Sequence, residues 1–374
     1  MLQVLPALEA GGVERGTLEI AAAQVAAGMR ALVASAGGAL VPALEALGAR
    51  HVALPLATKS PLGLWRNAAA LAEIVRRERI AILHARSRAP AWSALLAARR
   101  TGARLVTTYH GTYNEGLPGK RLYNSVMARG ERVIAISRFI AEHIVARHGT
   151  DPARIRIIPR GVDPAVFDPE AVAPARLAAL RRAWGLPERG DGPPVVMLPG
   201  RLTRWKGGMV LVEAMARLPR GEALALLVGG AEPRREGYRA ALEALIAARG
   251  LTGHVRLVGH CADMPAALLL ADVVVHASTD PEAFGRTVIE AQAMRRPVIA
   301  SDLGAPRETV EEAMTGWRVP PGDPDALAQA IHWVLTMPER ERAAVGARAR
   351  AQVLARYTTR AMQDATIAVY RELL

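Results

Sequence analysis

Short hydrophobic runs alternate with longer amphipathic stretches along the whole of this chain. Runs rich in Val, Ile and Leu predict strands, whereas stretches with a 3.6-residue period predict helices. Strands that alternate with helices in this way are typical of parallel α/β sheets. In the first half the predicted strands are Leu2–Leu5, Ala31–Ser35, His51–Leu54, Ile80–His84, Leu105–His110, Val133–Ser137 and Arg156–Pro159, and the predicted helices include Val13–Gly28, Trp65–Arg79 and Phe139–Arg147.

A polar stretch with several prolines interrupts this alternation in the middle of the chain. We interpret residues 171–193 as an interdomain linker with one helix near Arg176–Trp184. The alternation resumes with strands predicted at Val195–Leu198, Leu224–Val228, Val255–Val258, Val273–His276 and Val298–Ala300. The sequence therefore predicts two doubly wound Rossmann-like domains, residues 1–170 and 194–352, and a C-terminal helix within 353–374 that packs back on the first domain.

The length and composition agree with two intracellular domains. A chain of 374 residues exceeds the roughly 250–300 residues at which a single core stops growing. The lone Cys261 cannot form an internal disulfide, which favours a reducing compartment and a cytoplasmic location. We expect neither an export signal nor a membrane-spanning helix, because no basic, apolar leader and no apolar run of ~20 residues is present.

The charge of the chain is unusual and indicates an anionic partner. Lys and Arg number 48 against 35 Asp and Glu, a net charge of +13, and residues 1–170 carry 22 basic against 13 acidic residues. Nucleic acid is one candidate, but aromatic residues are only 4% of the chain and no nucleic-acid-binding motif is recognised. The inner face of an anionic membrane is favoured, and a diffuse solvated surface stays open as a third explanation. The basic residues that favour the membrane flank two predicted helices: Arg99, Arg100, Lys120, Arg121, Arg129 and Arg132.

Loops that follow the predicted strands contain the candidate chemistry, because parallel sheets bind ligands beyond the carboxyl ends of their strands. Gly11 and Gly12 precede the first helix, so their backbone can approach an anionic ligand closely. A turn that needs positive φ explains these glycines equally well. The chain contains neither G-x-G-x-x-G nor G-x-x-x-x-G-K-[ST], which gives no support to a nicotinamide or a Walker phosphate site.

Gly200, Arg201 and Lys206 follow the first strand of the second domain, where a guanidinium and an ammonium can together hold a diphosphate. Taken alone, Arg201 or Lys206 is equally well explained as a loop cation that only contacts solvent.

Glu282 and Glu290 follow the predicted strand Val273–His276, and a helix is predicted to start near Phe284. Carboxylates in the loop and on the helix can accept hydrogen bonds from hydroxyl groups on two parts of one extended ligand. The backbone N–H groups of Phe284 and Gly285 can meet its phosphate or sugar. For isolated glutamates, a favourable dipole interaction or a place on the helix surface is the commoner explanation.

The segment EAFGRTVIE at residues 282–290 resembles the E-x7-E region of retaining GT-B glycosyltransferases of family four, which use nucleotide sugars. The similarity continues through GGVER, YHGT, IPRGVD, PGRLTRWKG and GWRVPPGD. Several of these segments resemble alphaproteobacterial transferases of lipopolysaccharide core synthesis. The resemblance implies a GT-B fold, with two Rossmann-like domains facing across a cleft. It also implies transfer of a hexose-type sugar, with retention, to a glycan or glycolipid of the cell envelope.

The resemblance further implies roles for individual residues. Arg201 and Lys206 would bind the donor diphosphate, and Glu282 would bind the transferred sugar. Glu290 would hold the ribose hydroxyls, and His110 would meet the sugar near the reacting centre, so the catalytic candidates are His110, Glu282, Arg201 and Lys206. The donor-binding candidates are Gly11, Gly12, Gly200, Arg201, Lys206, Gly259, His260, Cys261, Phe284, Gly285, Arg286, Thr287 and Glu290.

Two positions depart from the family pattern. Arg160 stands where many relatives carry Asn, and Arg286 stands where Leu is common. Each adds a cation near the expected cleft, which serves an anionic sugar or acceptor or else faces outward.

We expect no metal and no other cofactor. A nucleoside diphosphate is already a good leaving group, and the only Asp-x-Asp, Asp323-Pro324-Asp325, is interpreted as a helix cap. The nine histidines show no metal-binding spacing. Two alternatives are kept: a GT-B-fold sugar-nucleotide epimerase, which needs no acceptor, and a basic nucleic-acid-binding protein. The donor base and sugar, the acceptor and the oligomeric state are left open by the sequence.

Overall fold

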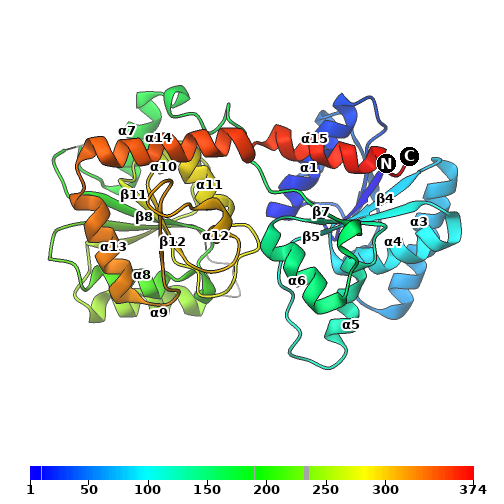
Figure 1. The fold of residues 1–374 in the computed structure, drawn as a ribbon, viewed down its shortest axis with the longest axis horizontal. Coiled ribbons are helices and arrows are strands. Elements are labelled where there is room, and N and C mark those ends of the chain that lie inside the picture. Colours follow the sequence, from blue (N-terminus) through cyan, green and yellow to red (C-terminus); the bar gives the residue numbers. More distant parts are fainter. Residues whose placement is uncertain (10, 189, 231–235) are drawn as a thin grey trace. The chain divides into compact units, whose positions relative to one another are not determined.

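The computed structural model describes residues 1–9, 11–188, 190–230 and 236–374, which form two compact units. Unit 1 comprises Met1–Pro159 and Thr359–Leu374, and unit 2 comprises Arg160–Thr358. Each unit is built on one parallel sheet with helices packed on its two faces (Figure 1). The predicted α/β fold with two Rossmann-like domains is confirmed.

Unit 1 has a seven-stranded sheet in the order β3-β2-β1-β4-β5-β6-β7. Its strands are β1 (Leu2–Val4), β2 (Leu32–Ser35), β3 (Arg50–Ala53), β4 (Ile82–Ala85), β5 (Arg104–Tyr109), β6 (Arg132–Ala135) and β7 (Ile155–Ile157). Its helices are α1 (Gly12–Ala26), α2 (Val41–Ala46), α3 (Pro61–Arg77), α4 (Arg88–Thr101), α5 (Lys120–Asn124), α6 (Arg138–His148) and α15 (Thr359–Arg371), with short 3-10 turns at Ser125–Ala128 and Pro152–Arg154. The strand order reverses between β1 and β4, which is the point where such sheets bind ligands.

Unit 2 has a six-stranded sheet in the order β10-β9-β8-β11-β12-β13. Its strands are β8 (Val195–Pro199), β9 (Leu224–Val228), β10 (Val255–Gly259), β11 (Val273–His276), β12 (Val298–Ser301) and β13 (Trp317–Val319). Its helices are α7 (Pro174–Trp184), α8 (Gly208–Met215), α9 (Glu236–Ala248), α10 (Met264–Leu269), α11 (Arg286–Ala293), α12 (Pro306–Thr309), α13 (Pro324–Thr336) and α14 (Glu339–Arg356), with 3-10 turns at Pro169–Ala171 and Arg204–Lys206. The edge strand β13 was not predicted, because three residues centred on an arginine give little hydrophobic signal.

The central strands of both sheets are buried along their whole length. Every residue of β4, β8, β9 and β11 is buried. A parallel strand covered by helices on both faces needs hydrophobic residues at consecutive positions and not at alternate ones. This is why uninterrupted apolar runs predicted these strands well.

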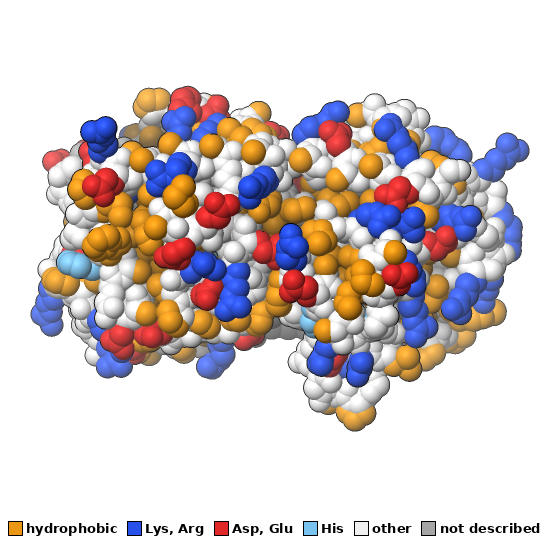
Figure 2. All heavy atoms as spheres, in the orientation of Figure 1, with side chains coloured by type: hydrophobic (Ala, Val, Ile, Leu, Met, Phe, Trp, Pro, Cys, Tyr) orange, Lys and Arg blue, Asp and Glu red, His pale blue; other side chains and the backbone are white. Residues whose placement is uncertain are grey.

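Basic side chains mark the surface of unit 1 over α3 and α4. Figure 2 shows Lys and Arg side chains gathered there, with hydrophobic side chains among them. Two large hydrophobic side chains of α3, Leu62 and Trp65, are strongly exposed, and so are Leu117 before α5 and Leu122 within it. Two arginines stack on aromatic rings nearby, Arg100 at 5.5 Å from the centroid of Trp65 and Arg129 at 5.1 Å from that of Trp92.

The boundaries of the units differ from the predicted domain limits. Residues 160–193 belong to unit 2, whereas we predicted the end of the first domain at 170 and a separate linker after it. Helix α7 packs on α10, and Arg176 pairs with Asp263 through distances of 2.8 and 2.6 Å. Polar, proline-containing sequence indicated a linker, but its helix α7 packs on α10 of unit 2. Arg189, within the predicted linker, lies outside the described residues.

The C-terminal segment returns to unit 1 through α15, which packs on α1. The buried Tyr370 hydroxyl lies 2.6 Å from His84 Nδ1, and His84 Nε2 lies 2.7 Å from Thr108 Oγ1. Because α14 continues to Arg356, the chain enters unit 1 at Thr359 and not at the predicted residue 353.

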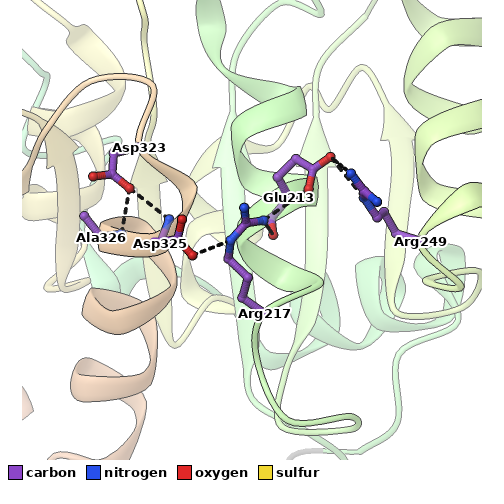
Figure 3. A network of polar contacts seen from close by, with 6 residues as sticks. All are labelled: Glu213, Arg217, Arg249, Asp323, Asp325 and Ala326. Atoms are coloured by element: carbon purple, nitrogen blue, oxygen red, sulfur yellow. Dashed lines mark hydrogen bonds and ion pairs between the residues drawn. The ribbon is translucent and has the colours of Figure 1, made fainter.

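The Asp-x-Asp sequence caps a helix, as predicted. Asp323 accepts hydrogen bonds from the backbone N–H groups of Asp325 and Ala326 at 3.0 and 2.9 Å, and Pro324 occupies the first turn of α13. The Asp325 carboxylate accepts a hydrogen bond from Arg217 Nε at 2.6 Å, which ties α13 to the end of α8 (Figure 3). A side-chain cap of this kind stabilises a helix by about 1 kcal/mol.

Candidate functional site

The loops that follow β8 and β11 meet at the C-terminal edge of the unit 2 sheet, because these two strands are neighbours. The Thr279 backbone N–H donates to the Trp205 carbonyl at 2.8 Å. Gly207 has a φ of +76°, and a Cβ added there would overlap the carbonyl oxygen of Ala277. The tertiary structure therefore brings together the basic loop and the E-x7-E loop, which lie far apart in the sequence.

Lys206 and Glu282 form a buried ion pair at this edge. Their side chains are 15% and 10% exposed, and Lys206 Nζ contacts Glu282 Oε1 directly. The ammonium also lies 4.4 Å from the centroid of the Trp205 ring. A buried carboxylate is stable in the ionised state only when it is paired and hydrogen-bonded, and both conditions hold here.

Two further side chains contact the same carboxylate oxygen. His276 Nε2 lies 3.1 Å from Glu282 Oε1, and Ser278 Oγ donates to that oxygen at 3.0 Å. Burial by itself would raise the pKa of Glu282, but the interactions with His276 and Lys206 outweigh it and hold this pKa well below its usual range. Glu282 is thus a fixed anion at neutral pH.

The backbone of Glu282 is held by the loop that follows β12. The Ala305 backbone N–H donates to the Glu282 carbonyl at 2.9 Å, and Gly304 forms an isolated bridge with Glu282. Gly304 has a φ of +69°, and a Cβ there would lie 2.5 Å from the Glu282 carbonyl oxygen. Only glycine accommodates both the positive φ and this close approach.

Helix α11 starts at Arg286, later than the predicted start near Phe284, with Gly285 as its N-cap at a φ of +78°. Glu290 is therefore only the fifth residue of the helix, and it is 7% exposed. Phe284 is buried, with its ring centroid 5.9 Å from that of Tyr357, so its side chain packs within unit 2. Thr287 is partly exposed in the first turn.

The two arginines that depart from the family pattern lie near each other. Arg286 donates from Nη2 to the Gly161 carbonyl at 3.2 Å, directly after Arg160 in the chain. Arg286 Nε lies 3.8 Å from Glu290 Oε1. Arg160 is only 6% exposed, so the alternative that it faces outward into solvent is wrong.

Three further donor-binding candidates lie at the same sheet edge, at the end of β10. Gly259 closes the strand with a φ of +78°, His260 is exposed, and Cys261 is buried. Burial raises the pKa of the Cys261 thiol. Strands β9 and β8 stand between β10 and β11, so only an extended ligand can reach from Cys261 to Glu282.

Gly200 and Arg201 follow β8, between these two ends of the candidate site. Arg201 is exposed, and a Cβ at Gly200 would lie 3.8 Å from Lys206 Cδ.

The remaining candidates lie in unit 1. Gly11 is the N-cap of α1 and Gly12 its first residue, and a Cβ at Gly12 would meet nothing within 4 Å, so this backbone is open to a ligand. Ala10 of the same loop lies outside the described residues.

His110 directly follows β5 and is partly buried, and its backbone N–H donates to Tyr113 Oη at 3.4 Å. The Tyr113 ring lies 4.7 Å from that of Tyr109 and 4.4 Å from the Arg88 guanidinium carbon. These contacts anchor the loop that presents His110.

Sequence reasoning missed His276, Ser278 and Gly304. His276 ends a predicted strand at the edge where ligands bind, and this position was an available signal. The sequence contained no signal for the role of Gly304, because its partner Glu282 is 22 positions away in the chain.

The described part of the chain offers neither a metal-binding cluster nor a membrane-spanning helix. It contains no group of three or more His, Cys, Asp or Glu residues placed to hold a metal ion. Among its helices, none is long and apolar enough to cross a membrane.

Residues 186–352 match the family described as Glycosyl transferases group 1, and residues 10–166 match Glycosyltransferase Family 4. The crystal structure of a glycosyltransferase from Rickettsia africae ESF-5 is 35% identical, with a TM-score of 0.91 over 100% of this chain and 97% of that chain. HepE of Anabaena, solved with UDP, is 26% identical, with a TM-score of 0.86 over 100% of this chain and 99% of that chain, and it has also been solved with UDP-glucose.

An alpha-D-kanosaminyltransferase of Streptomyces kanamyceticus is 34% identical over 208 residues, which are 54% of this chain and 51% of that protein. The chain spans about half the length of this relative.

Proposed function

Since this chain belongs to the group 1 and family 4 glycosyltransferases, we propose that it transfers a hexose-type sugar from a nucleoside-diphosphate sugar to a glycan or glycolipid acceptor. The observation that carries this proposal is the buried pair of Lys206 and Glu282 at the edge where parallel sheets bind ligands. A cation for a diphosphate and an anion for sugar hydroxyls lie in direct contact there. The binding of UDP and UDP-glucose by HepE supports a nucleotide-sugar donor.

In this proposal Arg201 and Lys206 hold the diphosphate, and Glu282 accepts a hydrogen bond from a hydroxyl of the transferred sugar. Glu290 holds the ribose, and the end of β10 borders the base. Charge develops on the diphosphate as the glycosidic bond breaks, and fixed cations stabilise such charge more effectively than mobile water does. The proposal includes no metal ion.

We propose transfer with retention, through attack on the face from which the diphosphate leaves. The acceptor oxygen forms a bond to the anomeric carbon, while the bond between that carbon and the phosphate oxygen breaks. The leaving phosphate oxygen takes the acceptor proton, so no side chain of the chain has to act as a base. His110 approaches the sugar at the reacting centre and orients it.

The first test compares two arginines of the same loop. Arg201→Ala should lower turnover with the donor at least about 100-fold, because one charge-assisted contact to the diphosphate contributes roughly 3 kcal/mol in the transition state. Arg204→Ala is the matched control, since Arg204 is also exposed and lies three positions away. An equal loss of turnover in both variants, or near wild-type turnover of Arg201→Ala, would contradict the proposed role of Arg201 in binding the diphosphate.

Product analysis separates the alternatives. A glycosyltransferase releases nucleoside diphosphate only when an acceptor is present, whereas an epimerase converts the sugar nucleotide by itself. The donor is sought by thermal shift with GDP-mannose, UDP-glucose, UDP-N-acetylglucosamine and ADP-heptose. A salt-dependent shift in the electrophoretic mobility of DNA, together with no thermal shift by any sugar nucleotide, would favour the nucleic-acid-binding alternative.

For the acceptor we propose a glycolipid of the cell envelope, such as a lipopolysaccharide core, in an anionic membrane. Residues 57–129 contain 13 Lys and Arg but only three Asp and Glu, so this segment carries a net charge of +10 out of +13. The segment includes α3, α4 and α5 with their exposed hydrophobic side chains. Clustered cations attract anionic lipid by about 1 kcal/mol each near the surface, and exposed Leu and Trp add insertion of apolar surface.

A further inference from the structure

The contacts of Glu282 fall on one of its two carboxylate oxygens. Lys206 Nζ, His276 Nε2 and Ser278 Oγ all approach Oε1, the last two at 3.1 and 3.0 Å. Three donors on one oxygen fix the rotation of the carboxylate about its last bond. They also use the acceptor capacity of Oε1, because a carboxylate oxygen accepts about two strong hydrogen bonds, so a ligand hydroxyl would have to bind Oε2.

The geometry at His276 indicates which proton it carries. The ring is 5% exposed, and Nδ1 is buried without a hydrogen-bond partner among the described residues. Nε2, by contrast, faces two oxygens, Glu282 Oε1 at 3.1 Å and Ser278 Oγ at 3.4 Å. Nε2 therefore carries a proton, and that proton points at Glu282 Oε1.

His276 is a suitable anchor because its own position is rigid. It is the last residue of β11, and its backbone pairs with Ala300 of β12. A Cβ on Gly285 would lie 3.5 Å from Nε2, so the N-cap of α11 closes the space on one side of the ring. Ser278, by contrast, lies in a loop, and Lys206 ends a short 3-10 turn with a side chain that has several rotatable bonds.

We propose that His276 is a positioning residue that locks the Glu282 carboxylate, so that Oε2 alone is presented to one hydroxyl of the transferred sugar. Lys206 has three N–H donors, and one is used by Glu282, which leaves two for the diphosphate. Because Lys206 contacts the fixed carboxylate, recognition of the sugar is coupled to recognition of the diphosphate. His276 contributes to this coupling without contacting either group. This inference rests on the proposed function, because it assumes that Glu282 binds the sugar.

The experiment compares the binding of a nucleoside diphosphate with that of the corresponding nucleotide sugar. The donor is the member of the four-compound panel that raises the melting temperature most, and affinities are measured by calorimetry. In His276→Leu the affinity for the nucleotide sugar should fall about 10-fold or more, as expected for loss of a hydrogen bond to a charged group. The affinity for the nucleoside diphosphate alone should stay within about twofold of wild type.

Conservative and control variants complete the test. His276→Gln places an amide N–H near the position of Nε2 and should restore most of the affinity for the nucleotide sugar. Ser278→Ala removes a second donor from Oε1 and should cause a smaller loss in the same direction. His332→Leu is the matched control, because His332 Nδ1 also pairs with a glutamate, Glu222, at 2.6 Å, but on the exposed face of α13.

The outcomes are distinguishable. The inference is overturned if His276→Leu binds the nucleotide sugar as wild type does, or loses both ligands to the same extent while Ser278→Ala loses neither. Failure of the wild-type protein to prefer any nucleotide sugar over its nucleoside diphosphate, with no transfer, would instead overturn the proposed function.

Discussion

At the scale of single residues, the site depends on placing a carboxylate where burial alone would neutralise it. Glu282 is 10% exposed in its side chain, yet its contacts with Lys206, His276 and Ser278 keep it charged. Removing one partner of such a buried pair typically costs about 3–5 kcal/mol, because the other charge is left uncompensated. The arrangement is therefore better suited to hold a substrate than to stabilise the fold, since the same volume filled with hydrophobic residues would be at least as stable.

The backbone beneath Glu282 can be tested through Gly304. In Gly304→Ala the new methyl group meets the Glu282 carbonyl, so the carboxylate should shift and donor affinity should fall at least about 10-fold. Gly250→Ala is the matched control, since Gly250 has nearly the same φ, +67° against +69°, and an open position with nothing within 4 Å. In both variants an alanine must adopt a positive φ, which lowers the stability of the fold by about 1 kcal/mol. Thermal unfolding and calorimetry separate that shared loss from the loss specific to Gly304.

At the scale of elements, the last helix is held on unit 1 by polar as well as hydrophobic contacts. Glu372 accepts hydrogen bonds from Arg132 Nε and Arg156 Nη2, both at 2.7 Å. The hydrogen bonds from Arg156 and Arg132 lower the pKa of Glu372 to about 2. Tyr370 adds a buried hydrogen bond to His84. The end of α15 is thus tied to the strands β4, β6 and β7.

The Glu372 contacts predict a pH dependence of stability. A carboxylate whose pKa is lower in the folded state stabilises the fold above its unfolded pKa, near 4.5, and this contribution is lost as the pH falls toward 2. Glu372→Gln should lower the unfolding midpoint at pH 7 only modestly, because a pair one third exposed contributes less than about 1 kcal/mol.

The difference from wild type should shrink steadily between pH 4.5 and about 2, measured by thermal unfolding. Asp364→Asn on the same helix, which breaks the more exposed pair with Arg360, is the control. A difference for Glu372→Gln that stayed constant down to pH 2 would contradict the assigned cause.

At the scale of the whole molecule, the charge is concentrated in one part of the chain. Residues 57–129 account for +10 of the net +13, and they include the α3 and α4 side of unit 1, where Figure 2 shows basic and hydrophobic side chains together. Charge spread evenly over the surface would explain solubility alone. Its concentration beside exposed Trp65 and Leu62 is what the proposed binding to an anionic membrane rests on.

Charge reversal at the end of α4 tests this surface. Arg99→Glu with Arg100→Glu should reduce co-sedimentation with phosphatidylglycerol vesicles at least about 10-fold, because the change of four charges costs several kcal/mol at low salt. Arg181→Glu with Arg182→Glu is the control, since these arginines also occupy the last turn of a helix, α7, but in unit 2. Equal binding of both double variants, or equal binding of wild type to phosphatidylcholine, would contradict a specific anionic-membrane surface.

The sequence by itself determined the elements and the kinds of chemistry. Consecutive apolar residues in β8 and β11 identified buried parallel strands, and the pattern from Glu282 to Glu290 indicated a ligand site, because both signals are local. The family match to glycosyltransferases agrees with that pattern. Residues 160–193, which include the predicted linker, lie in unit 2, where α7 packs on α10, a contact that the polar sequence did not indicate.

Only the tertiary structure decided how the candidate residues are held. Adjacency of β8 and β11 brings Lys206 to Glu282 across 76 positions of the chain, and the loop after β12 brings Gly304 beneath the same residue. The position of His276 at the end of a strand marks the edge where ligands bind, but only these contacts show that its partner is Glu282. Sequence patterns report local periodicity and residue type, whereas the order of strands in a sheet determines which loops meet, and therefore which charges can be buried together.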